Sequence, residues 1–271
     1  MNRQPFTSTF FLTYHPPYDW TSIRDFYQHR AIDGLEWVDD NAYGRTFNCD
    51  NHIGEFTATH QPEKNGFDVV IKASSSHNLA LVVKNIQRCL DLETDIINAE
   101  AALSQAIQAP IELNGMRLPG IWSPYEAGIR AIVGQQVSIK AARNLTEKII
   151  ASHPRNTEER RYFPTPSQVN EALINTLGMP QRRKETLLEF TRYAQKNSLI
   201  DSDYLINIRG IGPWTINYLK LRGDSNPDIY LSGDLGVKKA LSKLPDFDKF
   251  NPDLASPWRS YLTLYLWRLL D

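Results

Sequence analysis

An isolated acidic side chain, Asp234, stands directly before a short helix-forming run and is well suited to chemistry. Aspartate often occupies the N-cap position of a helix, where its side chain accepts a backbone hydrogen bond. The positive end of the helix dipole favours an ionised carboxylate at that position. Such a carboxylate can stabilise positive charge that develops in a transition state. Asp234 is therefore a candidate catalytic residue, although a capping role alone would also explain it.

Two large aromatic residues, Trp214 and Tyr218, are spaced one helical turn apart in a predicted helix. Leu221 continues the same face, while Ile216 and Leu219 lie on another side, so the helix is apolar over most of its circumference. We therefore expect this helix to be central to its domain. Aromatic residues in such a helix usually belong to the core. A tryptophan in the first turn can instead border a cleft, where its indole face stacks on a flat ligand.

A glycine-rich turn, Gly210-Ile211-Gly212, precedes this helix. Both glycines can adopt a positive φ without a Cβ penalty. Pro213 suits the first position of a helix, where its missing N–H costs nothing. The pattern predicts a tight turn that presents backbone N–H groups at a helix start, which favours phosphate binding. The same residues also fit an ordinary turn between two helices.

The composition is that of a folded globular protein, with 41% hydrophobic and 23% charged residues in 271 positions. This length suits one large domain or two ordinary ones. Two cysteines, Cys49 and Cys89, exclude a four-cysteine zinc or iron–sulfur site and argue against a disulfide scaffold. The sequence shows neither an apolar run long enough for a membrane span nor a signal-peptide core, so we expect a cytoplasmic protein.

Charge is distributed unevenly between the two parts of the chain. Residues 1–100 carry 8 Lys and Arg against 14 Asp and Glu, a net charge of −6. Residues 101–271 carry 22 against 17, a net charge of +5, and the whole chain has −1. The second part is therefore the candidate for binding a polyanion.

The periodicity of apolar residues predicts an α+β fold. Alternating residues indicate strands, and helical spacing indicates helices in the first part of the chain. The strands are predicted at 6–14, 34–39, 43–47, 54–60 and 67–72, and the helices at 20–31 and 77–92. We interpret residues 1–95 as an antiparallel sheet with two helices on one face. Residues 96–271 are predicted to form an all-α region.

Cap signals place two helices in the second part. Residues 123–126 (SPYE) form a predicted capping box with proline at the first helical position. Ser138 is expected to cap the next helix, with Ile139 facing inward. Gln135 and Gln136 fall at the junction of these helices, where side chains can project outward. Solvated glutamines are the more common outcome at such a place.

Short sequence motifs, defined by the residues given next, occur along nearly the whole chain. They are PPYDW (16–20), RLPG (117–120), FPTP (163–166), LGMP (177–180), LRG (221–223) and PWRSY (257–261). With the stretch from Gly210 to Tyr218, these motifs resemble the helix-hairpin-helix DNA glycosylases of the AlkA type, which act on 3-methyladenine. The resemblance places the hairpin at about residues 203–222. It also implies that the N-terminal sheet is similar to one repeat of the TATA-binding protein.

The resemblance implies roles for several residues. Asp234 matches the family's catalytic aspartate. Trp214, Tyr218 and Trp267 match aromatic residues of the pocket that receives the base, and Phe26 matches one from the N-terminal domain. The implied DNA contacts are Gly210, Gly212, Thr215, Gln135 and Gln136. The hairpin glycines commonly hold a phosphate through a bound monovalent cation, Na⁺ or K⁺, and no other cofactor is implied.

The resemblance also implies a function. The protein would act as a monomer on double-stranded DNA containing damaged bases, in the bacterial cytoplasm and at the nucleoid, with no membrane partner. It would flip out an alkylated purine such as 3-methyladenine or 7-methylguanine and hydrolyse its glycosidic bond. Relatives that also cleave the strand carry a Schiff-base lysine where this chain has Trp214. Hydrolysis without strand cleavage is therefore expected.

Two departures from the family pattern affect the expected base preference. Gln136 stands where the family carries an apolar wedge that fills the gap left by the flipped base. Leu235 stands where a tyrosine follows the catalytic aspartate. Two alternatives therefore stay open. One is a glycosylase for other bases, such as hypoxanthine or an oxidised purine. The other is a non-catalytic DNA-binding protein that uses the hairpin only to grip phosphates.

Overall fold

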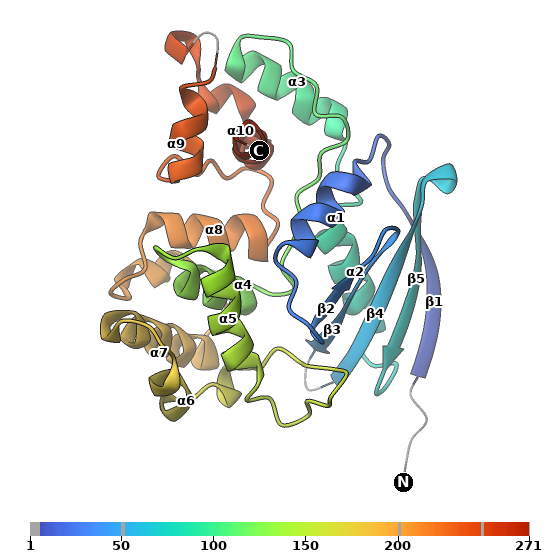
Figure 1. Ribbon diagram of the computed structural model, residues 1–271. Helices are drawn as coiled ribbons and strands as arrows, with labels where there is room; N and C mark the ends of the chain where they lie inside the picture. Colours follow the sequence, from blue (N-terminus) through green and yellow to red (C-terminus); the bar gives the residue numbers. More distant parts are fainter. Residues whose placement is uncertain (1–5, 50–51, 200–201, 245–246, 271) are drawn as a thin grey trace.

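Five antiparallel strands form the N-terminal sheet in the computed structural model (Figure 1). The structure describes residues 6–49, 52–199, 202–244 and 247–270. The strand order is β1-β5-β4-β3-β2, which places the first and fifth strands side by side. The strands are β1 (Phe6–Thr13), β2 (Glu36–Val38), β3 (Ala42–Cys49), β4 (His52–Gln61) and β5 (Gly66–Ala73).

Side-chain alternation along the strands explains why one face of the sheet is covered. In β5, Phe67, Val69 and Ile71 are buried, whereas Asp68 and Lys72 are exposed. The helices α1 (Trp20–Gln28) and α2 (Leu79–Leu90) lie on the apolar face (Figure 1). Because successive residues of a strand point to opposite faces, this alternation directs one set of side chains to the helices. The predicted sheet with two helices on one face is confirmed.

Helices make up the rest of the described chain. The α-helices are α3 (Ile96–Ile107), α4 (Pro124–Gly134), α5 (Ile139–Ile150), α6 (Glu171–Thr176), α7 (Gln181–Lys196), α8 (Pro213–Gly223), α9 (Leu235–Leu241) and α10 (Arg259–Arg268). Short 3₁₀ turns join them at η2 (Pro166–Gln168), η3 (Ser202–Asn207), η4 (Phe247–Lys249) and η5 (Pro252–Ala255), and a further turn, η1 (Pro62–Lys64), lies between β4 and β5. Among the described residues, no helix combines the length and apolar character needed to cross a membrane.

Helix α8 lies between the two hydrophobic cores of the helical part. Ile216 and Leu219 pack into a core shared with α4, α5 and α7. Leu221, on the same helix, packs into a second core shared with α3, α9 and α10. Figure 1 shows α8 between α4 and the pair formed by α9 and α10. The expected central position of this helix is confirmed, because its residues pack into both cores.

The two parts of the chain interlock near the predicted domain boundary. Leu92 is the last residue of the sheet core before Ile96 begins a core of the helical part. However, Ile32 and Leu35, from the loop after α1, are fully buried in the helical core around α4. Trp122 in turn packs into the sheet core. The boundary between residues 95 and 96 therefore stays a prediction.

Candidate active site

Asp234 is the N-cap residue of α9, as predicted. Its backbone is extended, with φ −73° and ψ 136°, and its Oδ1 accepts a hydrogen bond of 3.1 Å from the backbone N–H of Val237. This bond satisfies one of the backbone donors that a helix start leaves unpaired. The cap also fixes the direction of the carboxylate, because its backbone and one oxygen are both held.

Two indole groups hold the same carboxylate from different elements. Trp214, in the first turn of α8, donates its Nε1–H to Oδ2 of Asp234 over 3.0 Å. Trp267, near the end of α10, donates its Nε1–H to Oδ1 over 2.8 Å. Within the described part of the chain, Asp234 has no ion-pair partner, so neutral donors alone orient its charge. The structure thus brings together three of the predicted site residues.

The residues that follow Asp234 show how closely this arrangement is packed. A Cβ atom at Gly236 would lie 3.0 Å from Oδ1 of Asp234 and 3.1 Å from Cδ1 of Trp267. Glycine at this position therefore lets the indole reach the carboxylate. Sequence reasoning missed Gly236, whose only signal was a glycine in the first turn of a helix. Leu235 is 73% exposed and therefore contributes little to this packing.

A cleft opens beside the Trp214 indole, with a volume of about 210 Å³. The rings of Trp214 and Tyr218 stack with centroids 5.2 Å apart and an interplanar angle of 22°, and both line the cleft. Phe26, from α1 of the N-terminal part, lines it as well. Asp234 and Trp267 lie outside this lining, and Trp214 connects them to the cleft. Three of the four predicted aromatic residues therefore line the cleft. The fourth, Trp267, contacts the Asp234 carboxylate instead.

Two arginines contact the Phe26 ring, a feature that sequence reasoning missed. The Cζ atom of Arg30 lies 3.7 Å from the ring centroid, and that of Arg222 lies 4.4 Å from it. Both arginines line the cleft. Guanidinium groups bind aromatic faces through cation–π attraction. This wall of the cleft therefore presents positive charge together with an aromatic ring.

The hairpin turn before α8 uses its two glycines differently. Gly210 has φ +95°, and a Cβ there would lie 2.2 Å from Oγ1 of Thr186, so only glycine fits. Gly212 has φ −111° and ψ 179°, so Gly210 is the one of the two glycines that uses the positive φ open to both. A Cβ at Gly212 would meet nothing within 4 Å. This open backbone lies at the start of α8, where N–H groups lack helical partners.

The junction between α4 and α5 is tied to this hairpin. Gln135 donates its amide to the carbonyl of Gly210 over 3.1 Å and to the hydroxyl of Thr215 over 3.3 Å. Thr215 is only 4% exposed, and its hydroxyl accepts from Gln135, so the DNA contact expected of this side chain stays a prediction. Gln136 is exposed, and its φ of +58° places it in the left-handed region at the turn between the two helices. Ile139, predicted to face inward, is 53% exposed and lines the cleft instead.

The hairpin carbonyls offer oxygen ligands for the predicted monovalent cation. The carbonyls of residues 208–210 each accept one hydrogen bond, from the Ile211 N–H, the Thr186 hydroxyl and the Gln135 amide. A carbonyl oxygen has two lone pairs, so each of the three keeps one for a further partner. The cation therefore stays a prediction with a plausible set of oxygen ligands.

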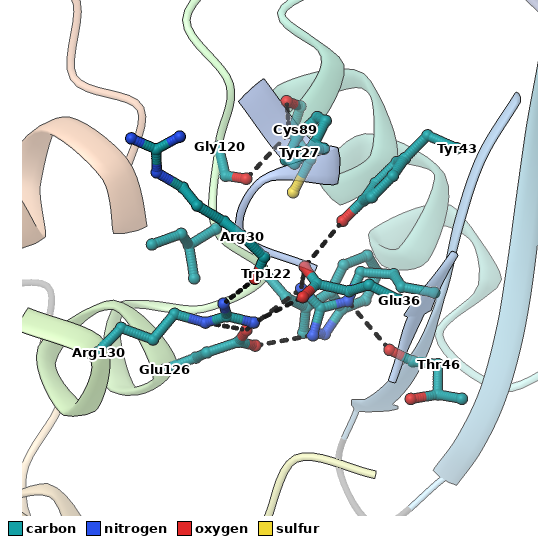
Figure 2. A network of polar contacts seen from close by, with 12 residues as sticks. Tyr27, Arg30, Glu36, Tyr43, Thr46, Cys89, Gly120, Trp122, Glu126 and Arg130 are labelled. Atoms are coloured by element: carbon teal, nitrogen blue, oxygen red, sulfur yellow. Dashed lines mark hydrogen bonds and ion pairs between the residues drawn. The ribbon is translucent and has the colours of Figure 1, made fainter. Parts of the chain in front are cut away.

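A buried network of charges joins the N-terminal part to α4 (Figure 2). Arg45 of β3 donates to Oε2 of Glu126 over 2.8 Å, and Arg130 donates to Oε1 of Glu126 and to Oε2 of Glu36 over 2.8 Å each. Burial raises the pKa of the Glu126 carboxyl, but Arg45 and Arg130 lower it more, so it lies below its usual value. The predicted capping box is therefore only half formed. Ser123 accepts the Glu126 N–H, while the Glu126 carboxylate pairs with these arginines.

The same network holds the segment that carries Phe26 and Arg30. Arg130 donates to the backbone carbonyl of Arg30 over 3.3 Å. Figure 2 shows the Arg30 guanidinium pointing away from the carboxylates of Glu36 and Glu126. The network thus fixes the backbone of this segment relative to α4. Its side chains are then directed toward the cleft.

Known proteins share this architecture. A family model described as the AlkA N-terminal domain matches residues 9–123. The chain is 30% identical to the DNA-3-methyladenine glycosylase 2 of Escherichia coli (strain K12), across 94% of this chain and 95% of that protein. The structure of a 3-methyladenine DNA-glycosylase from Archaeoglobus fulgidus matches with a TM-score of 0.74 at 17% identity, covering 95% of this chain and 97% of that one. An 8-oxoguanine glycosylase/lyase from Clostridium acetobutylicum matches with a TM-score of 0.66 at 15% identity, covering 99% of both chains. At such identities the two structures show a shared fold.

Proposed function

This chain belongs to the DNA-3-methyladenine glycosylase 2 family, and we propose that it extrudes alkylated purines from duplex DNA and hydrolyses their glycosidic bond at Asp234. The observation that carries the proposal is the position of the Asp234 carboxylate. Two indole N–H groups and one backbone N–H orient it, and no cation neutralises it among the described residues. A carboxylate held in this way can stabilise positive charge on a nearby sugar.

The proposed reaction proceeds by loss of the base. The target nucleotide leaves the stack because its glycosidic bond is inaccessible within a duplex. The bond from C1′ to the base nitrogen then breaks, and its electron pair leaves with the base. Positive charge develops on the sugar next to Asp234. A water molecule adds to C1′ and loses a proton, which completes hydrolysis.

Cationic purines such as 3-methyladenine and 7-methylguanine suit this mechanism. Alkylation at a ring nitrogen makes the base a good leaving group, because the departing base becomes neutral. No general acid is then needed. The stacked rings of Trp214 and Tyr218 offer aromatic faces to the base, and cation–π attraction is worth about 0.5–2 kcal/mol in such settings.

We propose hydrolysis without strand cleavage. Cleavage in this superfamily proceeds through a Schiff base between a lysine and the sugar, and this chain has Trp214 at that position. The Trp214 indole is also committed to Asp234 through its N–H. We expect no covalent complex to be trapped by borohydride during reaction with a damaged duplex. A trapped complex, visible as a band of higher mass on a denaturing gel, would contradict this part of the proposal.

The DNA is proposed to approach the hairpin and the junction between α4 and α5, with one protein molecule on each lesion. The open backbone at Gly212 and the start of α8 suit a phosphate. A monovalent cation on the hairpin carbonyls would strengthen the contact. Gln136 lies at the exposed tip of the junction, which Gln135 ties to the hairpin. We propose that Gln136 fills the gap left by the extruded base and offers hydrogen bonds there.

The decisive experiment measures base release from duplexes that each carry one lesion. The set comprises 3-methyladenine, 7-methylguanine, hypoxanthine and 8-oxoguanine. We expect release of the alkylated purines under single-turnover conditions, and Asp234→Asn to lower that rate by about 10²–10³-fold because it removes the stabilising charge. DNA affinity, measured by fluorescence anisotropy, should change little. Asp253→Asn, which alters an exposed aspartate, serves as the matched control.

The same experiment separates the alternatives. A protein that binds the duplexes but releases no base from any of them is a DNA-binding module, and the catalytic proposal fails. Release of 8-oxoguanine in preference to methylated purines would assign a different specificity. Equal rates for the unchanged protein and for Asp234→Asn would remove Asp234 from the mechanism.

A further inference from the structure

Arg222 places a buried positive charge at the wall of the cleft. Its side chain belongs to α8, one turn beyond Tyr218, and the residue is only 2% exposed. Its Nε–H donates to the carbonyl of Pro119 over 2.6 Å. In the part of the chain that the structure describes, no carboxylate forms an ion pair with it. A guanidinium has five N–H donors and cannot accept a hydrogen bond, so its other N–H groups can donate to a bound ligand.

Aromatic rings compensate this charge in place of a carboxylate. The Cζ atom of Arg222 lies 4.4 Å from the centroid of the Phe26 ring and 5.9 Å from that of Tyr218. Buried charges are otherwise expected to be paired, because desolvation disfavours them. Arg222 is an exception, because its buried charge has no carboxylate partner among the described residues. It lies at the wall of the cleft beside Trp214 and Tyr218, which the proposed function assigns to the base.

The acidic group at this cleft does not neutralise Arg222. Glu36 lines the cleft, but Arg130 binds it over 2.8 Å and Arg45 lies 3.6 Å from it. Arg30 adds further positive charge to the lining, whereas Arg143, which also lines the cleft, pairs with Glu147 over 3.5 Å. The cleft is therefore positive overall, although the lesions of the proposed function include cationic purines.

A base stacked on Tyr218 would be close enough to feel this charge. Repulsion between two unit charges about 6 Å apart, at the effective dielectric constant of a protein, changes an equilibrium by roughly tenfold to a hundredfold. A neutral base with a carbonyl oxygen would instead accept a hydrogen bond from the guanidinium, and bonds to charged donors are the strong ones. The two kinds of lesion therefore respond to Arg222 with opposite sign.

We propose that Arg222 is a specificity-determining residue, which disfavours cationic bases in the cleft and favours neutral purines that carry a carbonyl oxygen. This inference rests on the proposed function, since it requires that the cleft receives the extruded base. It also explains how a cleft lined by Trp214 and Tyr218 can accept neutral bases as well as cationic ones. Aromatic attraction and guanidinium repulsion act on the same ring position.

The experiment compares 7-methylguanine, which is cationic in DNA, with hypoxanthine, which is neutral. Both purines carry a carbonyl at the same ring position but differ in a methyl and an amino group as well as in charge, so the change of their ratio between variants, rather than the ratio itself, reports the effect of the Arg222 charge. Single-turnover rates with excess protein give the 7-methylguanine to hypoxanthine ratio for each variant, independently of the fraction of active protein. Arg222→Gln and Arg222→Met remove the charge, and the apolar methionine suits the neighbouring rings. Arg222→Lys keeps the charge, and Lys220→Gln makes the same charge change on α8 away from the cleft lining.

We expect the ratio to rise about tenfold or more in the two neutral variants. It should stay within about twofold of the unchanged protein in Arg222→Lys and Lys220→Gln. An unchanged ratio in either neutral variant that folds by circular dichroism overturns the proposal, as does an equal rise in Arg222→Lys. Absence of base release by the unchanged protein would instead refute the proposed function, so the two failures are distinguishable.

Discussion

The carboxylates of this protein are held by opposite kinds of partner in two regions. Between the sheet and α4, Glu36 and Glu126 are buried and bound by the guanidinium groups of Arg45 and Arg130. At the start of α9, Asp234 is half-buried and accepts only N–H groups of indole rings and of the backbone. The first region is neutralised within the protein. The second keeps a charge that faces no cation of the described chain.

The two regions differ in whether the charge of the carboxylate is neutralised by a cation of the protein. Opposite charges in the buried network compensate one another, so their strongest effect is on the arrangement of the two parts of the chain. The indole donors at Asp234 fix its direction and leave its charge unneutralised among the described residues, as the proposed stabilisation of a positive transition state requires. Arg222 is the cationic counterpart of Asp234, because it too is directed without being neutralised.

The largest effect is expected from breaking the buried network. Glu126→Gln should lower the free energy of unfolding by about 3–5 kcal/mol, because it leaves two buried arginine charges with Glu36 as the remaining carboxylate of the network, so that one positive charge is uncompensated. Urea unfolding followed by circular dichroism measures the loss. The variant should also weaken the contact between the N-terminal part and α4.

The control for this prediction is an ion pair at the surface. Glu171 pairs with Arg192 over 3.1 Å, and both side chains are more than half exposed. Glu171→Gln should therefore change the free energy of unfolding by about 1 kcal/mol or less. If Glu126→Gln costs no more than Glu171→Gln, the buried network does not hold the two parts together.

A smaller effect is expected from removing one indole donor. Trp267→Phe keeps an aromatic ring but deletes the N–H that donates to Asp234 over 2.8 Å. Hydrogen bonds to charged groups are worth about 1.5–3 kcal/mol, so we expect base release to slow by roughly tenfold to a hundredfold. Single-turnover release of 7-methylguanine measures the effect, and DNA affinity should be preserved.

Trp258 provides the matched control for this substitution. It lies at the N-cap of α10, at the opposite end of the helix from Trp267, and it donates no hydrogen bond to Asp234. Trp258→Phe should leave the rate of base release within about twofold of the unchanged protein. Equal rate losses in the two variants would mean that Trp267 acts through packing alone.

The smallest effect concerns pH and the buried network. Because the pKa of Glu126 is lower in the folded state, its contribution to stability is present above the unfolded pKa of about 4.3. The contribution disappears as pH falls through the folded value. The stability difference between the unchanged protein and Glu126→Gln should therefore be constant from about pH 5 to pH 8 and shrink below about pH 4. Urea unfolding at each pH provides the test, and a difference that grows toward acid would contradict it.

Local patterns in the sequence predicted the elements of the fold and several site positions. The five strands, the cap at Asp234 and the central helix from Pro213 depend on residues within a few positions of one another. Gly210 was also identified from its neighbours, and its φ of +95° agrees with the predicted turn. Gly212 was identified in the same way, but the sequence does not specify which of the two glycines reverses the chain, and Gly212 has φ −111°.

Partners that are distant along the chain escaped sequence reasoning. Glu126 carries the signal of a capping box, yet its carboxylate binds Arg45, which is 81 residues away. Ile139 follows helical spacing, but its side chain lines a cleft that exists only once α1 and α8 meet. The arginine contacts at Phe26 likewise join separate parts of the chain.

The sequence by itself determined the periodicity of strands and helices, the caps, and the family motifs that indicate a base-excising enzyme. Only the tertiary structure decided which carboxylates are paired with arginines, as Glu126 is, and which have no cationic partner among the described residues, as Asp234 does. The physical reason is that periodicity and capping act within a few residues, whereas the electrostatics of a site depends on distances between elements. Asp234, Trp214 and Trp267 meet only because α8, α9 and α10 pack around a shared core.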